Sequence, residues 1–207
     1  MNKLRIGLDI DDTLGDFYGH YKSFFNAEKN PRVMEDKNIT KNVCKLRTNK
    51  DFWLSLPKID SINFEPELYC TKRINPKAWS REWLVNNGFP NKPIYQMIYQ
   101  GGNKAVMIKG RCNVLIDDSV SNVLKCIDSG MPALLIDRPH NRWFGPQYRI
   151  FSLDIDEIID AYNILLEFNG ENFIWLEGIW CTRYDSFNIL RVRFESTYWI
   201  VSYRVLC

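Results

Sequence analysis

Histidine is scarce in this chain of 207 residues, and its cysteines lack metal-binding spacing. There are two histidines and six cysteines, and no Cys-x-x-Cys motif occurs. Zinc sites in proteins draw on clusters of these two residue types, so the pattern gives no zinc site. We therefore interpret the cysteines as reduced thiols.

Long apolar runs are also missing. No run reaches the roughly 18 residues that span a bilayer. The N-terminal stretch "MNKLRIGLDIDD" reaches its aspartates too early for a signal peptide. We therefore expect a cytoplasmic protein without a membrane partner. Basic and acidic residues are nearly balanced, at 27 against 25, with no long basic run. This balance does not favour nucleic acid as a partner.

The composition that remains, 45% hydrophobic and 25% charged, is typical of a globular protein. Short apolar runs suggest strands at 4–9, 67–71, 92–97, 113–117 and 132–137. Helical patterns alternate with them at 75–88 and 119–130, where Gly88 and Gly130 are helix stops, and at 154–168. Strands that alternate with helices predict an α/β fold with a doubly wound parallel sheet.

Two segments depart from this alternation. Residues 15–66 exceed the usual connection between strands, which suggests a small helical cap beside a core of residues 1–14 and 67–168. Residues 169–207 are rich in aromatic residues and predict a β-rich extension of two or three antiparallel strands. We favour a structural addition for this extension, and a self-association surface that forms a homodimer is the alternative.

Three aspartates crowd the end of the first predicted strand, in "RIGLDIDDTLGDF" at residues 5–17. Asp9, Asp11 and Asp12 could form an ordinary surface turn, because Asp is common where strands end. Alternatively, they share a hard divalent cation such as Mg²⁺, since close carboxylates repel one another unless positive charge lies among them.

Other polar residues follow the ends of other predicted strands. Because ligands bind outside the carboxyl ends of strands in open α/β sheets, we expect these residues to share one edge. They are Thr71, Lys104, Asp117 and Asp118, and they join Asp9 of the first strand. Taken singly, each has a plainer interpretation: the Asp pair as a helix N-cap, the threonine as a strand residue and the lysine as a surface residue. Lys109 is the rival of Lys104, which we prefer because it follows a Gly-Gly turn.

The chemistry of these groups suits phosphoryl transfer. Asp9 is the candidate nucleophile toward phosphorus, and Asp11 the candidate acid and base. Thr71 and Lys104 can stabilise the transferred group. Candidate ligands of Mg²⁺ are Asp9, Asp11, Asp117 and Asp118.

These residues carry a family resemblance. "DIDDTL", followed in order by Thr71, Lys104 and "DD" at 117–118, resembles the four motifs of the haloacid dehalogenase (HAD) superfamily over about residues 1–150. The resemblance implies a HAD-like Rossmannoid core, a nucleophilic first aspartate and magnesium as the cofactor. It also implies phosphate chemistry, because the dehalogenases lack the second acid, here Asp11.

A closer resemblance is to the 5'(3')-deoxyribonucleotidases and their phage and bacterial relatives. It lies in "DDTLGDFYGHYKSFFN", "DFWLSLPKI", "WLVNNGFPNKPIY" and "VLIDDSVSN", followed by "IDRPHN". In that family aromatic residues of the cap embrace the nucleobase, and Phe17, Phe52 and Trp53 are the matching candidates. The alternative is that Phe52 and Trp53 only pin the cap to the core.

The sequence departs from these relatives in two places. It has "TKRI" where they often have Thr-Ser-Arg or Thr-Ala-Arg-Pro, and it carries the aromatic tail from residue 169. We count Lys72 and Arg73 as candidate substrate ligands, although Arg73 could instead cap a surface. The sequence thus predicts a Mg²⁺-dependent nucleotidase acting on nucleoside monophosphates, with deoxyribonucleoside forms preferred. The alternatives are a phosphatase for another small phosphate ester or a nucleic-acid 3' end, and a non-catalytic binding or assembly protein.

Overall fold

The structure, a computed structural model, describes most of the chain before residue 168 and only backbone beyond it. The described residues are 3–27, 42, 44–97, 102–145 and 148–167, with the strands at 173–176, 179–184, 189–194 and 197–202. Among them, no helix is long and apolar enough to cross a membrane.

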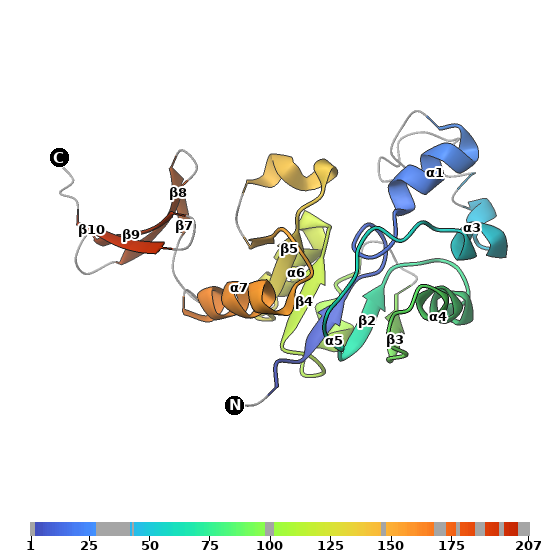
Figure 1. Cartoon of the computed structure of the whole chain (residues 1–207), viewed down its shortest axis with the longest axis horizontal. Coiled ribbons are helices and arrows are strands. Elements are labelled where there is room, and N and C mark those ends of the chain that lie inside the picture. The colour runs from blue at the N-terminus through green and yellow to red at the C-terminus, as the bar shows by residue number, and fades with distance from the viewer. Residues whose placement is uncertain are drawn as a thin grey trace.

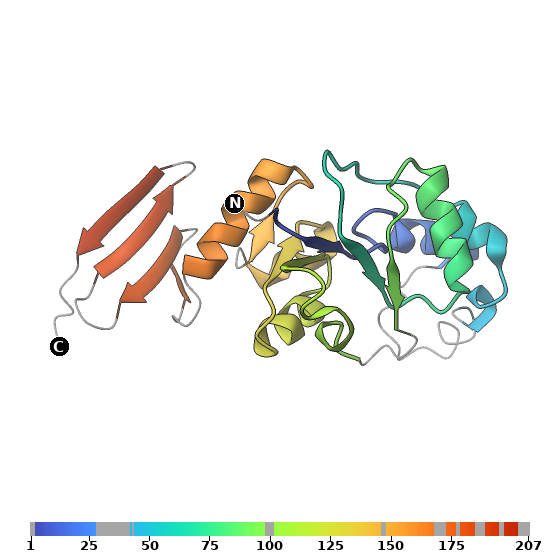
Figure 2. The ribbon, with the colours of Figure 1, turned by 90° about the horizontal axis from the view of Figure 1, so that it is seen from below.

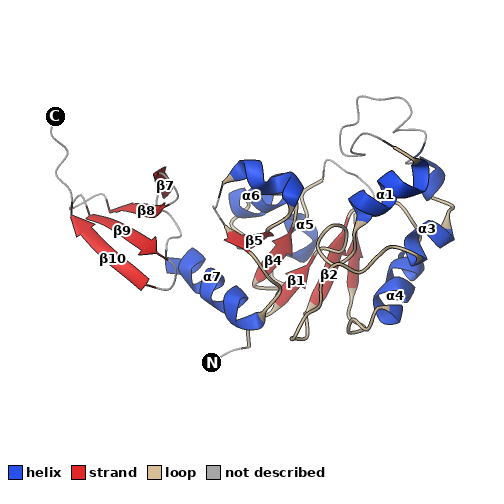
Figure 3. Ribbon diagram, turned by 45° about the horizontal axis from the view of Figure 1, so that its top comes forward, coloured by secondary structure: helices blue, strands red, loops and turns tan. Residues whose placement is uncertain are grey.

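Six parallel strands form the central sheet (Figures 1 and 3). They are β1 (Ile6–Leu8), β2 (Leu68–Thr71), β3 (Ile94–Gln96), β4 (Val114–Asp117), β5 (Ala133–Ile136) and β6 (Arg149–Ile150). Their order is β3-β2-β1-β4-β5-β6, and each neighbouring pair runs parallel. The predicted α/β fold with a parallel sheet is confirmed, and the strand order reverses direction between β1 and β4, where such sheets bind ligands.

Helices connect these strands and cover both faces of the sheet. They are α4 (Lys77–Asn86), α5 (Ala105–Ile108), α6 (Val120–Asp128) and α7 (Ile155–Glu167), with a 3₁₀ helix, η1, at Pro139–Phe144. Gly88 and Gly130, with φ of 78° and 67°, follow α4 and α6 as expected of helix stops. Alternate strand residues enter two buried apolar clusters, with Val114 and Ile116 in one and Leu115 in the other.

The segment between β1 and β2, residues 15–66, is called the insertion below. It contains α1 (Phe17–Phe25) and α3 (Lys50–Leu54), which Asp16 and Asn49 cap by accepting the backbone N–H of Gly19 and Phe52. Figure 1 shows both helices at the α4 end of the sheet. Trp83 of α4 donates its Nε1 hydrogen to the Leu56 carbonyl at 2.8 Å, so the insertion is fastened to the core.

A second, antiparallel sheet follows α7 (Figure 2). Its strands are β7 (Phe173–Leu176), β8 (Ile179–Tyr184), β9 (Ile189–Phe194) and β10 (Thr197–Ser202), in the order β10-β9-β8-β7. The described residues of this segment form four antiparallel strands, where two or three were expected. Because the side chains of this sheet lie outside the described residues, its role in self-association stays a prediction.

Candidate active site

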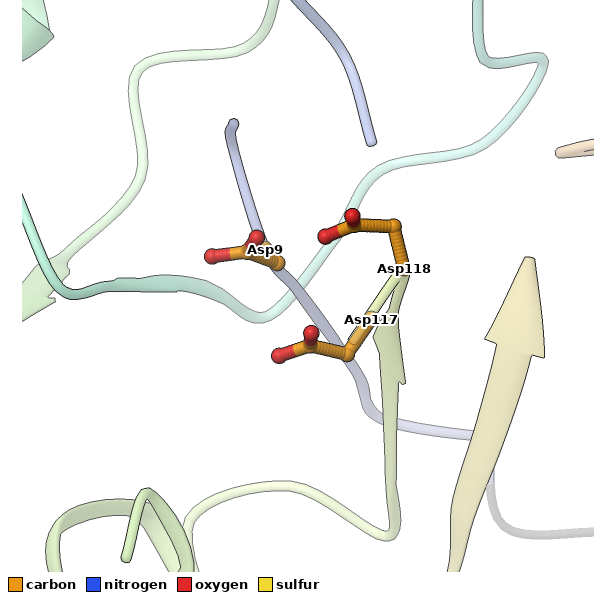
Figure 4. A group of neighbouring side chains, drawn as sticks. All are labelled: Asp9, Asp117 and Asp118. Carbon is orange, nitrogen blue, oxygen red and sulfur yellow. The ribbon is translucent and has the colours of Figure 1, made fainter. Parts of the chain in front are cut away.

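Three buried carboxylates meet where β1 and β4 end (Figure 4). Asp9 follows β1, Asp117 closes β4 and Asp118 comes next in the chain. One oxygen from each lies within 4.8 Å of the others, and the three residues are at most 5% exposed. The strand ends therefore bring together three of the four candidate metal ligands, and Asp11 is outside this group.

Lys104 supplies positive charge inside this cluster. It lies at the start of α5, and its Nζ donates to Asp9 Oδ1 and, at 2.7 Å, to Asp117 Oδ2. Burial alone would lower the pKa of Lys104, but Asp117 and Asp9 outweigh it and raise the pKa above its ordinary value. Lys109 instead donates to the Ser129 carbonyl on the exposed surface. The preference for Lys104 thus agrees with the geometry.

Asp9 remains electrostatically strained in spite of this lysine. Burial is the largest influence and raises the pKa of Asp9 well above its ordinary value, against the lowering effect of Lys104. The neighbouring carboxylates, Asp117 first, raise it further. One ammonium thus faces three buried carboxylates, and the cluster favours additional positive charge.

Asp117 is held in place by several hydrogen bonds. Asn122 of α6 donates its Nδ2 hydrogens to both carboxylate oxygens at 3.1 Å, and the Ser119 N–H donates to Oδ1 at 2.9 Å. Lys72 donates to Asn122 Oδ1 at 2.7 Å, which fixes the amide with its nitrogen toward Asp117. Lys72 therefore lies beside the site and supports a residue of the acidic cluster.

Thr71 ends β2 and is fully buried. Its Oγ1 accepts the backbone N–H of Arg73 at 3.2 Å, which shapes the turn that leaves the strand. The threonine thus lies at the expected edge of the sheet, and its proposed contact with a phosphoryl oxygen stays a prediction.

Arg73 does not lie on the surface. Its side chain is fully buried, its Nε donates to Asp11 Oδ1 at 2.9 Å, and its Nη2 lies 2.8 Å from the same oxygen. The guanidinium carbon is 5.0 Å from the Trp53 ring centroid and 5.4 Å from that of Trp83. The interpretation of Arg73 as a surface cap is wrong, since burial leaves the guanidinium no solvent contact.

The three aromatic candidates all lie in one ring cluster of the insertion. Phe52 and Trp53 are at most 2% exposed, and Phe17 is half-buried. Phe17 stacks on Trp53 with centroids 5.7 Å apart, and Phe52 meets Trp53 edge to face at 5.2 Å. Trp53 also donates its Nε1 hydrogen to the Leu46 carbonyl at 2.7 Å. This burial agrees with the alternative that Phe52 and Trp53 pin the insertion to the core.

Residues that the sequence did not single out complete the site. Asn122 orients Asp117, as described above. His140 Nε2 lies 2.6 Å from Asp118 Oδ2, and Asn141 donates to the Asp118 carbonyl at 2.9 Å. His140 and Asn141 both belong to η1 and to the motif "IDRPHN". Nothing in the spacing of that motif shows that η1 turns back onto Asp118.

The donor set of Asp9, Asp117 and Asp118 could hold a hard metal ion. Hard divalent cations prefer carboxylate oxygens, and the three acids are buried and adjacent, with Lys104 paired to only two of them. The same edge of the sheet thus places the Asp9 carboxylate beside the Lys104 ammonium, with a second, partly exposed acid at Asp11.

Searches among known proteins add no assignment to this geometry. Neither the protein-family models nor the curated proteins contain a match to this chain.

Proposed function

We propose that this protein is a Mg²⁺-dependent phosphomonoesterase that acts through an aspartyl-phosphate. The observation that carries the proposal is the convergence of Asp9, Asp117 and Asp118 on one point beside Lys104, with Asp11 two residues from the nucleophile. The resemblance to the HAD motifs supports the same assignment.

Asp9 is the nucleophile of this mechanism. A carboxylate oxygen of Asp9 forms a bond to phosphorus while the bond from phosphorus to the ester oxygen breaks. Lys104, already bound to Asp9 and Asp117, offsets negative charge on the transferred group. Mg²⁺ held by Asp9, Asp117 and Asp118 would supply further positive charge for the phosphate oxygens.

Asp11 moves the protons. Its carboxyl group gives a proton to the leaving alkoxide, and the resulting carboxylate then takes one from the water that attacks the phosphorus of the aspartyl-phosphate. This second displacement releases inorganic phosphate and restores the carboxylate of Asp9. Asp11 suits this role because its side chain is 20% exposed, whereas Asp9 is almost fully enclosed.

The proposed substrates are nucleoside monophosphates, with deoxyribonucleoside 5'(3')-monophosphates first. The resemblance to the deoxyribonucleotidases supports this choice, with the insertion serving as the cap. Phe17 is the aromatic candidate for contact with the base, because it alone of the three keeps partial exposure. Stacking on such a ring contributes about 1 to 3 kcal/mol per base in single-strand binders and discriminates little between bases.

A panel of nucleotides, sugar phosphates and 4-nitrophenyl phosphate, assayed with Mg²⁺ or with EDTA, tests the proposal. We expect turnover that requires the metal and is abolished in Asp9→Asn. Asp128→Asn, on the exposed end of α6, is the control and should keep wild-type rates. Turnover in EDTA, or an active Asp9→Asn variant, would overturn the mechanism.

The same assay separates the alternative functions. Stronger inhibition by oligonucleotide 3' ends than by mononucleotides would favour a nucleic-acid substrate. A folded wild-type protein that turns over no ester would favour the alternative of a non-catalytic binding or assembly protein.

A further inference from the structure

The environment of Arg73 is unusual for an arginine beside a phosphate site. Its side chain is fully buried, and it is paired with the partly exposed Asp11. Trp53 of the insertion and Trp83 of α4 both approach the guanidinium. Its Nη1 lies 3.4 Å from Ser80 Oγ. These contacts hold the guanidinium against Asp11.

The contacts with Asp11 fall on one carboxylate oxygen. Nε donates to Oδ1, and Nη2 approaches the same Oδ1. Arginine frequently contacts both oxygens of a carboxylate in a bidentate pair. Contact with Oδ1 alone fixes the rotation of the carboxyl group and leaves Oδ2 outside the guanidinium pairing.

The two tryptophans explain how the guanidinium is held there. A buried guanidinium loses hydration, and cation–π contact with the two rings offsets part of that cost. The main chain of Arg73 is fixed as well. Its N–H donates to Thr71 Oγ1, and its carbonyl accepts a hydrogen bond from Gln96 Nε2 at 2.8 Å. The arginine is therefore a rigid support.

We propose that Arg73 is a positioning residue for Asp11, which it holds through Oδ1 so that Oδ2 exchanges the proton with the leaving group. The inference rests on the proposed function and assigns Arg73 a task other than substrate binding. Through Trp53, the orientation of the acid also depends on the packing of the insertion.

The test compares two leaving groups in Arg73→Met. The leaving group of 4-nitrophenyl phosphate needs no proton, whereas a nucleoside 5'-monophosphate releases an alkoxide that does. Since kcat/KM covers only the steps up to phosphoryl transfer, the later use of Asp11 as a base does not enter. We expect kcat/KM to fall about 100-fold for the nucleotide and less than about 3-fold for the aryl ester. Asp11→Asn should show the same asymmetry.

Two further variants separate positioning from folding. Arg73→Lys keeps the charge without the guanidinium geometry and should show the same asymmetry at a smaller size. Arg149→Met removes another buried arginine, which pairs with Asp137 at 2.7 Å. It should lower the midpoint of thermal unfolding without changing the ratio of the two kcat/KM values.

The outcomes are distinct. Equal losses for both esters in Arg73→Met and Arg73→Lys would overturn the inference, because a phosphate ligand or a purely structural residue affects both substrates alike. Wild-type protein that turns over neither ester would overturn the proposed function, and the inference with it.

Discussion

The edge of the sheet and the insertion bury their side chains in opposite ways. At the edge, Asp9, Asp117 and Asp118 are buried with Lys104 as their internal cation. In the insertion, Phe52 is fully buried among aromatic rings, with His20 at 4.7 Å and Trp53 at 5.2 Å between centroids. The first region depends on the balance of charge, and the second on the filling of volume.

The two regions therefore tolerate different substitutions. A charged cluster is sensitive to the removal of one partner, because the charges that remain are buried without compensation. An aromatic cluster is sensitive to lost volume and insensitive to ionic conditions. Arg73 joins the two regions, since it binds Asp11 and contacts Trp53.

Lys104→Met should have the largest effect. It removes the ammonium from between Asp9 and Asp117, and loss of one partner from a buried ion pair costs about 3 to 5 kcal/mol. We expect a fall of that size in the free energy of unfolding, measured by denaturant titration, together with loss of phosphatase turnover.

Lys109→Met is the matched control for this variant. Lys109 is exposed and donates only to a backbone carbonyl among the described residues, so its replacement should change stability by less than about 0.5 kcal/mol. Equal stability of the two variants would contradict the charge balance described for the edge of the sheet.

Phe52→Ala should have the next largest effect and act on stability alone. Removal of a buried phenyl ring costs about 3 kcal/mol or more, while KM for nucleotides should stay within about twofold. Phe24→Ala is the control, because Phe24 lies 5.3 Å from Phe52 in the same cluster but is 45% exposed.

The opposite result would restore the stacking role of Phe52. A tenfold rise in KM for nucleotides, without a rise for 4-nitrophenyl phosphate and without lost stability, would show that the ring contacts the base.

Much of the central sheet follows from local pattern. The five longer strands have apolar runs that are covered on both faces, so the chain signals them directly. β6 escapes prediction because two residues, Arg149 and Ile150, carry no periodicity. The number of C-terminal strands was underestimated because a run of aromatic and β-branched residues shows β-propensity without marking every turn.

The candidate site, like the sheet, could be predicted from the sequence only in part. Asp9, Lys104 and Asp117 could be brought together from the sequence, because parallel strands end at one edge. The partner of Arg73 could not, since it depends on how the turn after β2 faces the turn after β1. The burial of Phe52 could not be predicted either, because an aromatic residue in a helix has the same sequence pattern whether it lines a site or fills a core.

Mg²⁺ should stabilise the edge of the sheet by a smaller amount. A ligand that binds only the folded state adds about 1.4 kcal/mol when its free concentration is ten times Kd. We expect the midpoint of thermal unfolding to rise with MgCl₂ relative to NaCl at equal ionic strength, and EDTA to reverse the rise. Asp117→Asn should lose this gain and Asp128→Asn should keep it. A full gain in Asp117→Asn would place the cation elsewhere.

Protonation of His20 should have the smallest effect, and it is confined to the insertion. Burial lowers the pKa of His20, against weaker raising effects of the Phe52 backbone and Asp16. Above the pKa of the unfolded chain, about 6.5, the ring is neutral in both states. Below it, the unfolded chain takes up its proton first, so stability falls as pH decreases toward the folded pKa.

His20→Gln isolates this contribution, because glutamine carries no titrating proton. The comparison is made in a His140→Gln background, which leaves His20 as the sole histidine. In that background the free energy of unfolding should fall more steeply from pH 7.5 to 5.5 when His20 is kept than when His20→Gln is added. Identical slopes would mean that the ring is hydrated in the folded state, and that the aromatic cluster is less closed than the contacts of Phe52 indicate.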